Sequence, residues 1–130
     1  LHTIDAEETI NRIVDFFPSH EQTQIRMALA QSLRGIVSQR LVTRSNGKGR
    51  CAVAEVMINT GRTAESIINP GDNPPITDLI SEGEYYRMQT FDQHLFDLVN
   101  AGHVTYEAAC SVASNPQDLT IELRAAGIIQ

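Results

Sequence analysis

One extended segment lies between helical segments in this chain, and it restricts the folds that the chain can adopt. Leu41 and Val42 begin this segment, and residues 50–58 continue it with a run rich in Ala, Val and Ile. Between them, the pair Asn46 and Gly47 is typical of a hairpin turn. The sequence therefore predicts a two-stranded β-hairpin. Because an isolated hairpin is barely stable in water, it must pack against helices or extend a further sheet.

Helical patterns fill most of the remaining chain. Asp5 and Glu8 have the spacing of a helix cap, apolar residues follow at helical intervals, and Pro18 ends this first helix. A second helix is expected from Ser19 to Ile36, with apolar residues along one face. Shorter helices are expected over residues 63–68, 76–83, 90–101, 105–115 and 117–126.

These patterns predict an α-rich α+β fold, in which helices accompany one β-hairpin. With 130 residues, of which 42% are hydrophobic, the chain is long enough for one core and short for two. We therefore expect a single domain over residues 1–130.

The charge balance restricts the partners of the chain. It carries 16 acidic and 10 basic side chains, which gives a formal net charge of -6. Because binding to nucleic acid requires a basic face, this balance argues against a nucleic-acid partner. No apolar run reaches the length of about 20 residues that a membrane-spanning helix needs, and we expect no direct insertion into a membrane.

Common motifs for phosphate, metal and nucleophilic chemistry are missing from the sequence. Gly47 and Lys48 form the only Gly-Lys pair, but Val42 occupies the P-loop position for the first glycine, and Gly49 that for Ser or Thr. None of the histidines pairs with Cys or His at ligand spacing, so we expect no metal site. No GxSxG motif predicts a nucleophile. These residues alone indicate a helical domain without an evident activity.

Several segments, however, carry a family pattern in a constant order. They are residues 1–3 (LHT), 9–18 (TINRIVDFFP), 33–41 (LRGIVSQRL), 54–57 (AEVM) and 88–93 (MQTFDQ). The first two resemble the end of the "His box" and the region that follows it in secretion-superfamily ATPases. In this order, the segments resemble the C-terminal part of the type IV pilus retraction ATPases.

This resemblance implies the C-terminal half of a RecA-like P-loop ATPase domain within a homo-hexamer. It also implies ATP and Mg²⁺ as cofactors, a cytoplasmic location at the inner face of the membrane, and an inner-membrane pilus platform protein as partner. Such rings hydrolyse ATP to power pilus retraction and twitching motility. Since the family's P-loop and Walker B segments lie upstream of the position that Leu1 matches, we expect this chain alone to be inactive.

The resemblance further implies four site residues. His2 matches the second histidine of the His box, and Arg12 matches an arginine at or near the active site, so both are catalytic candidates. Leu41 and Gly49 match positions that approach the adenine ring, and they are the candidates for cofactor binding. A purely structural role stays open for each of these residues. For Arg12, that role is an ion pair with Glu8, one helical turn away.

Other functions also stay open. The family carries arginines in the helix after the hairpin, whereas residues 63–69 have none, which leaves a divergent paralogue as one alternative. A stand-alone helical adaptor module belongs to a different class, and the start of the chain at Leu1 instead of Met argues against it. A pilus-assembly or type II secretion ATPase is a further alternative, although residues 88–93 favour retraction.

Overall fold

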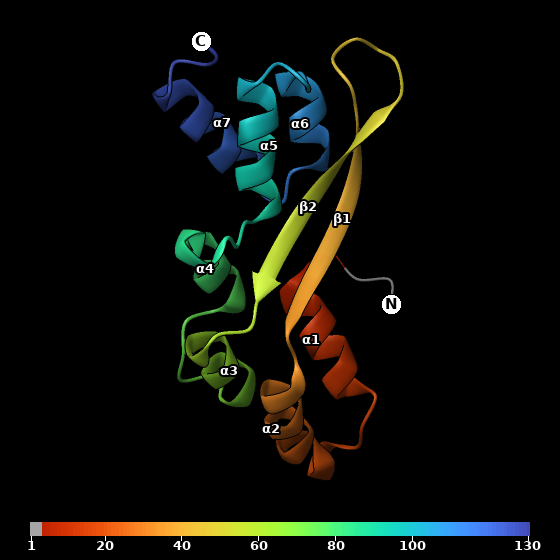
Figure 1. The fold of residues 1–130 in the computed structure, drawn as a ribbon, viewed down its shortest axis with the longest axis vertical. Coiled ribbons are helices and arrows are strands. Elements are labelled where there is room, and N and C mark those ends of the chain that lie inside the picture. Colours follow the sequence, from red (N-terminus) through yellow and green to blue (C-terminus); the bar gives the residue numbers. More distant parts are fainter. Residues whose placement is uncertain (1–3) are drawn as a thin grey trace. The chain divides into compact units, whose positions relative to one another are not determined.

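The computed structural model describes residues 4–130 of the chain, which divides into two compact units (Figure 1). Of the described residues, the first unit contains residues 4–38 and Glu55–Gln89, and the second contains Gln39–Ala54 and Thr90–Gln130. Each strand of the hairpin contributes residues to both units. The expected single domain over residues 1–130 stays a prediction.

The predicted β-hairpin is confirmed. Within the described part of the chain, its strands β1 (Gly35–Thr43) and β2 (Arg50–Ile58) form a two-stranded sheet. At the loop end, the backbone N–H of Arg44 donates to the carbonyl of Gly49 at 3.1 Å. Residues 46–47 lie inside this loop, which is longer than the two-residue turn that such a pair often forms.

The second helix is shorter than the sequence predicts. A 3-10 turn, η1 (Ser19–Glu21), leads into α2 (Gln22–Ser32), and the next residue is already extended, with ψ at 133°. The prediction of a helix as far as Ile36 is therefore wrong. Gly35 begins β1 instead. A Cβ atom at this glycine would lie 2.7 Å from the carbonyl oxygen of Met57, so only glycine allows the two strands to approach there.

Three further helices and a 3-10 turn belong to the first unit: α1 (Ala6–Asp15), α3 (Gly61–Ile68), α4 (Ile76–Ser81) and η2 (Glu84–Tyr86). The buried side chains of this unit form one cluster, which joins the helices to β2. Its members are Ala6, Ile10, Ala30, Met57, Ile67, Ile76, Ile80 and Met88. The apolar stripe of α1 therefore packs into the same core as the inner face of β2.

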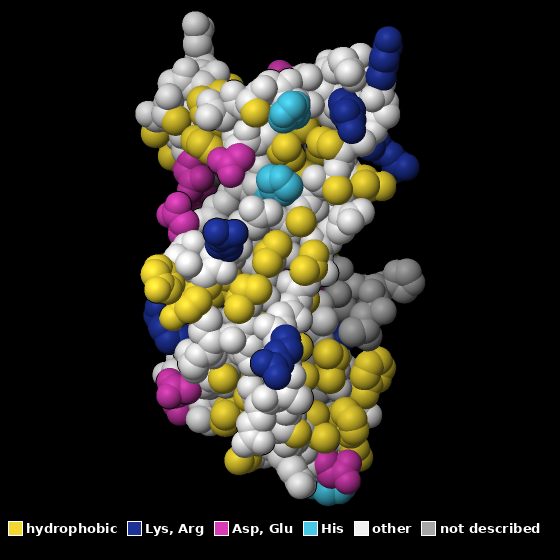
Figure 2. Space-filling view, viewed as in Figure 1, with side chains coloured by type: hydrophobic (Ala, Val, Ile, Leu, Met, Phe, Trp, Pro, Cys, Tyr) yellow, Lys and Arg dark blue, Asp and Glu magenta, His cyan; other side chains and the backbone are white. Residues whose placement is uncertain are grey.

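Large hydrophobic side chains of the first unit also reach the surface. Phe16, directly after α1, is 72% exposed, and Met27 of α2 is 46% exposed. Figure 2 shows hydrophobic side chains at the surface over α1 and α2. Phe16 and Met27 are thus hydrophobic side chains that the core of this unit does not cover.

The second unit contains α5 (Phe91–Asn100), α6 (Tyr106–Val112) and α7 (Pro116–Ala125), which lie near the loop end of the hairpin (Figure 1). A capping box begins α5. The N–H of Gln93 donates to Oγ1 of Thr90 at 3.1 Å, and the N–H of Thr90 donates to Oε1 of Gln93 at 3.0 Å. The core of this unit consists of Val42, Val53, Phe91, Leu95, Val104, Ala109, Leu119 and Leu123.

The predicted α-rich α+β fold is confirmed, since helices make up both units and the hairpin supplies the sheet. Among residues 4–130, no helix combines the length and the apolar character needed to cross a bilayer.

Candidate functional site

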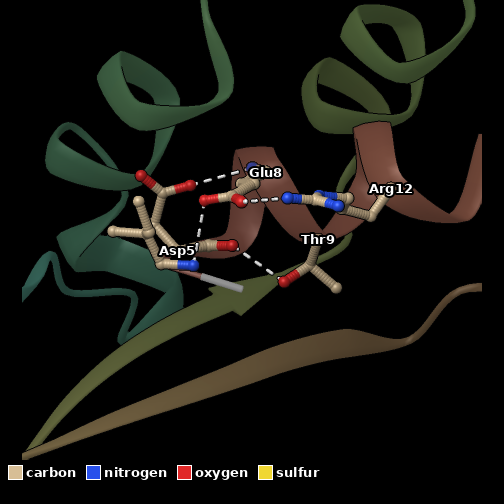
Figure 3. Close-up of polar contacts among 5 residues, drawn as sticks. Asp5, Glu8, Thr9 and Arg12 are labelled. Carbon is tan, nitrogen blue, oxygen red and sulfur yellow. Dashed lines mark hydrogen bonds and ion pairs between the residues drawn. The ribbon is translucent and has the colours of Figure 1, made fainter. Parts of the chain in front are cut away.

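Helix α1 carries the catalytic candidate Arg12, and its start is fixed by local hydrogen bonds (Figure 3). Asp5 is the N-cap, and its Oδ1 atom accepts the N–H of Glu8 at 2.8 Å. The hydroxyl of Thr9 donates to the carbonyl of Asp5 at 2.8 Å. An N-cap acid is favourable because it satisfies a helix N–H and lies at the positive end of the helix dipole. The predicted cap at Asp5 and Glu8 therefore begins α1.

Arg12 lies on the exposed side of α1. Its side chain is 60% exposed, and one guanidinium nitrogen lies 3.5 Å from Oε1 of Glu8 (Figure 3). The expected alternative, an ion pair one turn back, is thus present. Exposed pairs of this kind contribute only about 0.3–0.5 kcal/mol. Such a weak pair leaves the guanidinium able to turn to a stronger anion, and the catalytic role of Arg12 stays a prediction.

The other catalytic candidate, His2, lies outside the residues that the structure describes. Its assignment to the phosphate end of a nucleotide site therefore stays a prediction.

Leu41 lies on the outer face of β1. Its side chain is 44% exposed, whereas the neighbouring Val42 is only 2% exposed and belongs to the core of the second unit. This difference follows from the alternation of side chains along a strand. An apolar side chain in this position is free to cover the face of an aromatic ring, as the resemblance implies.

Gly49 ends the loop between the strands and has a φ of +76°. Residues with a side chain rarely adopt this left-handed conformation. No atom lies within 4 Å of the place that a Cβ atom would occupy, so crowding does not explain the glycine. The turn itself requires Gly49, and a contact with adenine would be an additional role.

The loop between the strands is ordered by its own hydrogen bonds and by hydrogen bonds to the residues that follow α5. The N–H of Lys48 donates to Oδ1 of Asn46 at 2.8 Å, as in turns stabilised by Asn. The N–H of Ser45 donates to the carbonyl of His103 at 2.9 Å, and its hydroxyl donates to the carbonyl of Gly102 at 2.6 Å. A pocket of about 280 Å³ opens here, lined by Arg44, Ser45, Asn46, Cys51, Leu98 and His103.

Arg40 has a role that sequence reasoning missed. Its guanidinium lies 3.8 Å from the centre of the Phe91 ring, and it donates to the carbonyl of Val112 at 2.8 Å and to Oγ of Ser114 at 3.0 Å. Nearby, the carboxylate of Asp92 accepts the N–H of Ser114 at 2.8 Å. Phe91 and Asp92, which come from the family-like segment of residues 88–93, therefore have a structural function in the second unit.

A buried acid, Glu55, also escaped the sequence analysis. It is 3% exposed, and its Oε1 atom accepts the backbone N–H of Ala6 at 3.0 Å. The available signal was a carboxylate within the apolar run of residues 50–58, at a position that alternation directs inward.

Among the histidines of residues 4–130, His94 has a backbone partner. Nδ1 of His94 accepts the N–H of Ala54 at 3.0 Å, which gives this side chain a structural role. Within residues 4–130, no group of three or more His, Cys, Asp or Glu side chains could hold a metal ion.

Comparison with known proteins places this fold and these residues in context. No protein-family model matches the chain. It is 38% identical to the type IV pilus ATPase PilU of Pseudomonas aeruginosa, over 95% of this chain and 32% of PilU. It is 36% identical to the type IV pilus retraction ATPase PilT of the same organism, over 91% of this chain and 34% of PilT. A twitching motility protein of Neisseria gonorrhoeae is 35% identical over 92% of this chain and 32% of that protein.

The solved structures that match this chain are also ATPases or ATPase motors. A crystal structure of the pilus retraction motor PilT with bound ADP matches with a TM-score of 0.75 and 35% identity, over 93% of this chain and 33% of that chain. The ATPase DotB of Legionella pneumophila, at 20% identity, shares the fold with a TM-score of 0.68 over 86% of this chain and 30% of that chain. The expected resemblance to pilus retraction ATPases is confirmed. The chain spans about a third of the length of these relatives.

Proposed function

We propose that this chain is the C-terminal part of an ATPase that powers type IV pilus retraction and twitching motility. The observation that carries this proposal is the similarity to PilU and PilT along more than nine-tenths of the chain, at 38% and 36% identity. Because the chain matches only about a third of each relative, the activity belongs to a longer protein.

In that longer protein, the chain completes a RecA-like domain that binds ATP with Mg²⁺. The ADP in the matching PilT crystal structure supports a nucleotide as ligand. We assign His2 and Arg12 to the phosphate end of the nucleotide, and Leu41 and Gly49 to the adenine ring. The exposed, apolar side chain of Leu41 supports the second assignment, since an aromatic ring needs an apolar surface to cover it.

The chemistry proposed for Arg12 is stabilisation of charge during phosphoryl transfer. Its planar guanidinium offers several N–H donors to phosphate oxygens, and its charge opposes the negative charge that spreads over them in the transition state. The high exposure of the side chain and its weak ion pair with Glu8 support this role, because little stabilisation is lost when the guanidinium turns to a phosphate.

The proposed assembly is a homo-hexamer in the cytoplasm, which acts on a pilus platform protein of the inner membrane. The exposed hydrophobic side chains over α1 and α2, including Phe16 and Met27, support contact with further polypeptide in the longer protein.

ATP hydrolysis by two preparations tests this function. We expect the longer protein that contains this chain to hydrolyse ATP in the presence of Mg²⁺, and the 130-residue chain to bind no ATP tightly and to be inactive. Circular dichroism confirms beforehand that the isolated chain is folded. If the longer protein is folded but does not hydrolyse ATP, the proposal is contradicted. If the isolated chain hydrolyses ATP, the expectation that the phosphate-binding residues lie outside these 130 residues is wrong.

A further inference from the structure

The buried carboxylate of Glu55 needs a physical explanation. It lies in β2, at an inward position next but one to Met57, which is fully buried in the core of the first unit. Removing a carboxylate from water costs several kcal/mol unless hydrogen bonds and opposite charge compensate for it. An aliphatic residue would suit this position of a strand better, so the acid is expected to have a specific partner.

One partner of this carboxylate is the beginning of α1. Oε1 of Glu55 accepts the backbone N–H of Ala6 at 3.0 Å, across a separation of 49 residues in the sequence. Ala6 is the first residue of the helix and is itself fully buried. Its N–H has no acceptor within the helix, and the helix dipole makes this end positive. A carboxylate is therefore stabilised at this point more than a neutral acceptor would be.

Two carboxylates accept N–H groups at the start of α1. Asp5 accepts the N–H of Glu8 at 2.8 Å, and this local bond determines at which residue the helix begins. Glu55 accepts the N–H of Ala6 from another element, and this bond determines where on β2 the helix begins. The apolar contacts of Ile10 in the core restrain the helix less strictly, because dispersion and burial are not directional.

We infer that Glu55 is a positioning residue, which fixes α1 on β2 and thereby sets the location of Arg12. Arg12 follows Ala6 by less than two helical turns, about 9 Å along the helix axis. A shift or rotation at the start of α1 is therefore transmitted to the guanidinium. The inference rests on the proposed function of Arg12, and it assigns Glu55, which is 3% exposed, no contact with the nucleotide.

Replacements at position 55 distinguish the effect of the hydrogen-bond acceptor from the effect of side-chain volume. Glu55→Gln keeps an oxygen that can accept the N–H of Ala6, whereas Glu55→Met fills a similar volume without it. Glu82→Met is the matched control, since Glu82 is an acid of the same unit whose side chain is 60% exposed and pairs with Arg62 at 3.6 Å. The measurements are kcat and KM for ATP in the longer protein, and amide hydrogen exchange of α1.

We expect Glu55→Met to lower kcat roughly ten- to hundredfold with little change in KM, as for a displaced catalytic group. The amides in the first turn of α1 should exchange at least about tenfold faster, because a cap is lost. Glu55→Gln and Glu82→Met should stay within about threefold of the wild type in both measurements. Equal kcat values for all three variants would overturn the inference.

A double-mutant cycle shows whether Glu55 acts through Arg12. If it does, Glu55→Met combined with Arg12→Ala should be no slower than Arg12→Ala alone. Multiplicative losses in the double mutant would overturn the inference and indicate a general structural role. An inactive wild type would instead contradict the proposed function, so the two failures are distinguishable.

If Glu55→Met does not fold, a second variant tests whether the hydrogen bond between Glu55 and Ala6 is required. Ala6→Pro removes the donor instead of the acceptor, and proline is well tolerated at the first position of a helix. The preceding Asp5 has φ -156° and ψ -177°, an extended conformation that a following proline accepts. We expect the same loss of kcat as for Glu55→Met, and a kcat equal to that of the wild type would overturn the inference.

Discussion

The guanidinium of Arg40 lies 3.8 Å from the centre of the Phe91 ring and also donates to the carbonyl of Val112 at 2.8 Å. A strand of the hairpin is thus joined to the start of α5 and to the end of α6 by a single side chain. The same guanidinium donates to Oγ of Ser114 at 3.0 Å, in the segment that leads into α7. Arg40 therefore connects β1 to α5, to α6 and to the segment before α7.

Replacement of Arg40 tests this connection. We expect Arg40→Ala to lower the free energy of unfolding by about 2 kcal/mol, because it removes charged hydrogen bonds and a cation-π contact. Arg62→Ala is the control, since this exposed arginine makes a surface ion pair and should cost about 0.5 kcal/mol or less. Urea unfolding of the isolated chain measures both. Equal losses for the two variants would mean that the Arg40 contacts are not stabilising.

The N-cap of α1 gives a second stability prediction. Asp5→Ala should lower the free energy of unfolding by about 1 kcal/mol, the usual effect of losing an N-cap acceptor. Asp5→Asn keeps an oxygen for the N–H of Glu8 and should cost much less. Thermal unfolding followed by circular dichroism compares the two variants. A loss for Asp5→Asn as large as that for Asp5→Ala would contradict the assigned hydrogen bond.

The turn conformation of Gly49 gives a third prediction. Gly49→Ala should destabilise the chain by about 1–2 kcal/mol, because φ is +76° and a Cβ atom is unfavourable there. Gly61 starts α3 without a positive φ, and no atom lies within 4 Å of its Cβ position, so Gly61→Ala should be neutral or stabilising. Urea unfolding midpoints distinguish the two. A neutral Gly49→Ala would show that the turn accepts another conformation.

The adenine contact assigned to Leu41 can be tested separately from stability. Leu41→Ser should weaken nucleotide binding by the longer protein roughly tenfold, since an apolar cover of the ring is worth about 1.5 kcal/mol when lost. Val37→Ser is the control, because Val37 is also on the outer face of β1 and is 73% exposed. Isothermal titration with ADP gives both dissociation constants. Equal affinities for the two variants would exclude Leu41 from the site.

The sequence predicted those elements whose signals are local. The helix cap at Asp5 is confirmed, because Asp5 and Glu8, whose N–H it accepts, lie within one helical turn. The end of α2 could not be found in this way, since apolar residues continue at helical spacing through Ile36. The strand begins at Gly35, where the backbone closely approaches Met57, a residue distant in the sequence. Such a contact has no local signature.

In the candidate site, too, residues within recognisable sequence segments were identified, whereas a contact between distant residues was not. Arg12 and Leu41 were identified through ordered family segments, and the structure gives both side chains the exposure that their proposed roles require. Glu55 was not identified, because its partner Ala6 is 49 residues away and supplies only a backbone N–H. A backbone donor leaves no residue type that a sequence pattern could reveal.

The most direct test of the account compares two arginines of the first unit in the longer protein. The side chains of Arg12 and Arg62 are 60% and 67% exposed, and each lies about equally far, 3.5 and 3.6 Å, from a glutamate. The measurement is kcat for ATP hydrolysis. If Arg12 stabilises the transferred phosphoryl group, Arg12→Ala should lower kcat roughly a thousandfold, whereas Arg62→Ala should leave it nearly unchanged. Equal rates for the two variants would contradict the assignment of this chain to the catalytic site of a pilus ATPase.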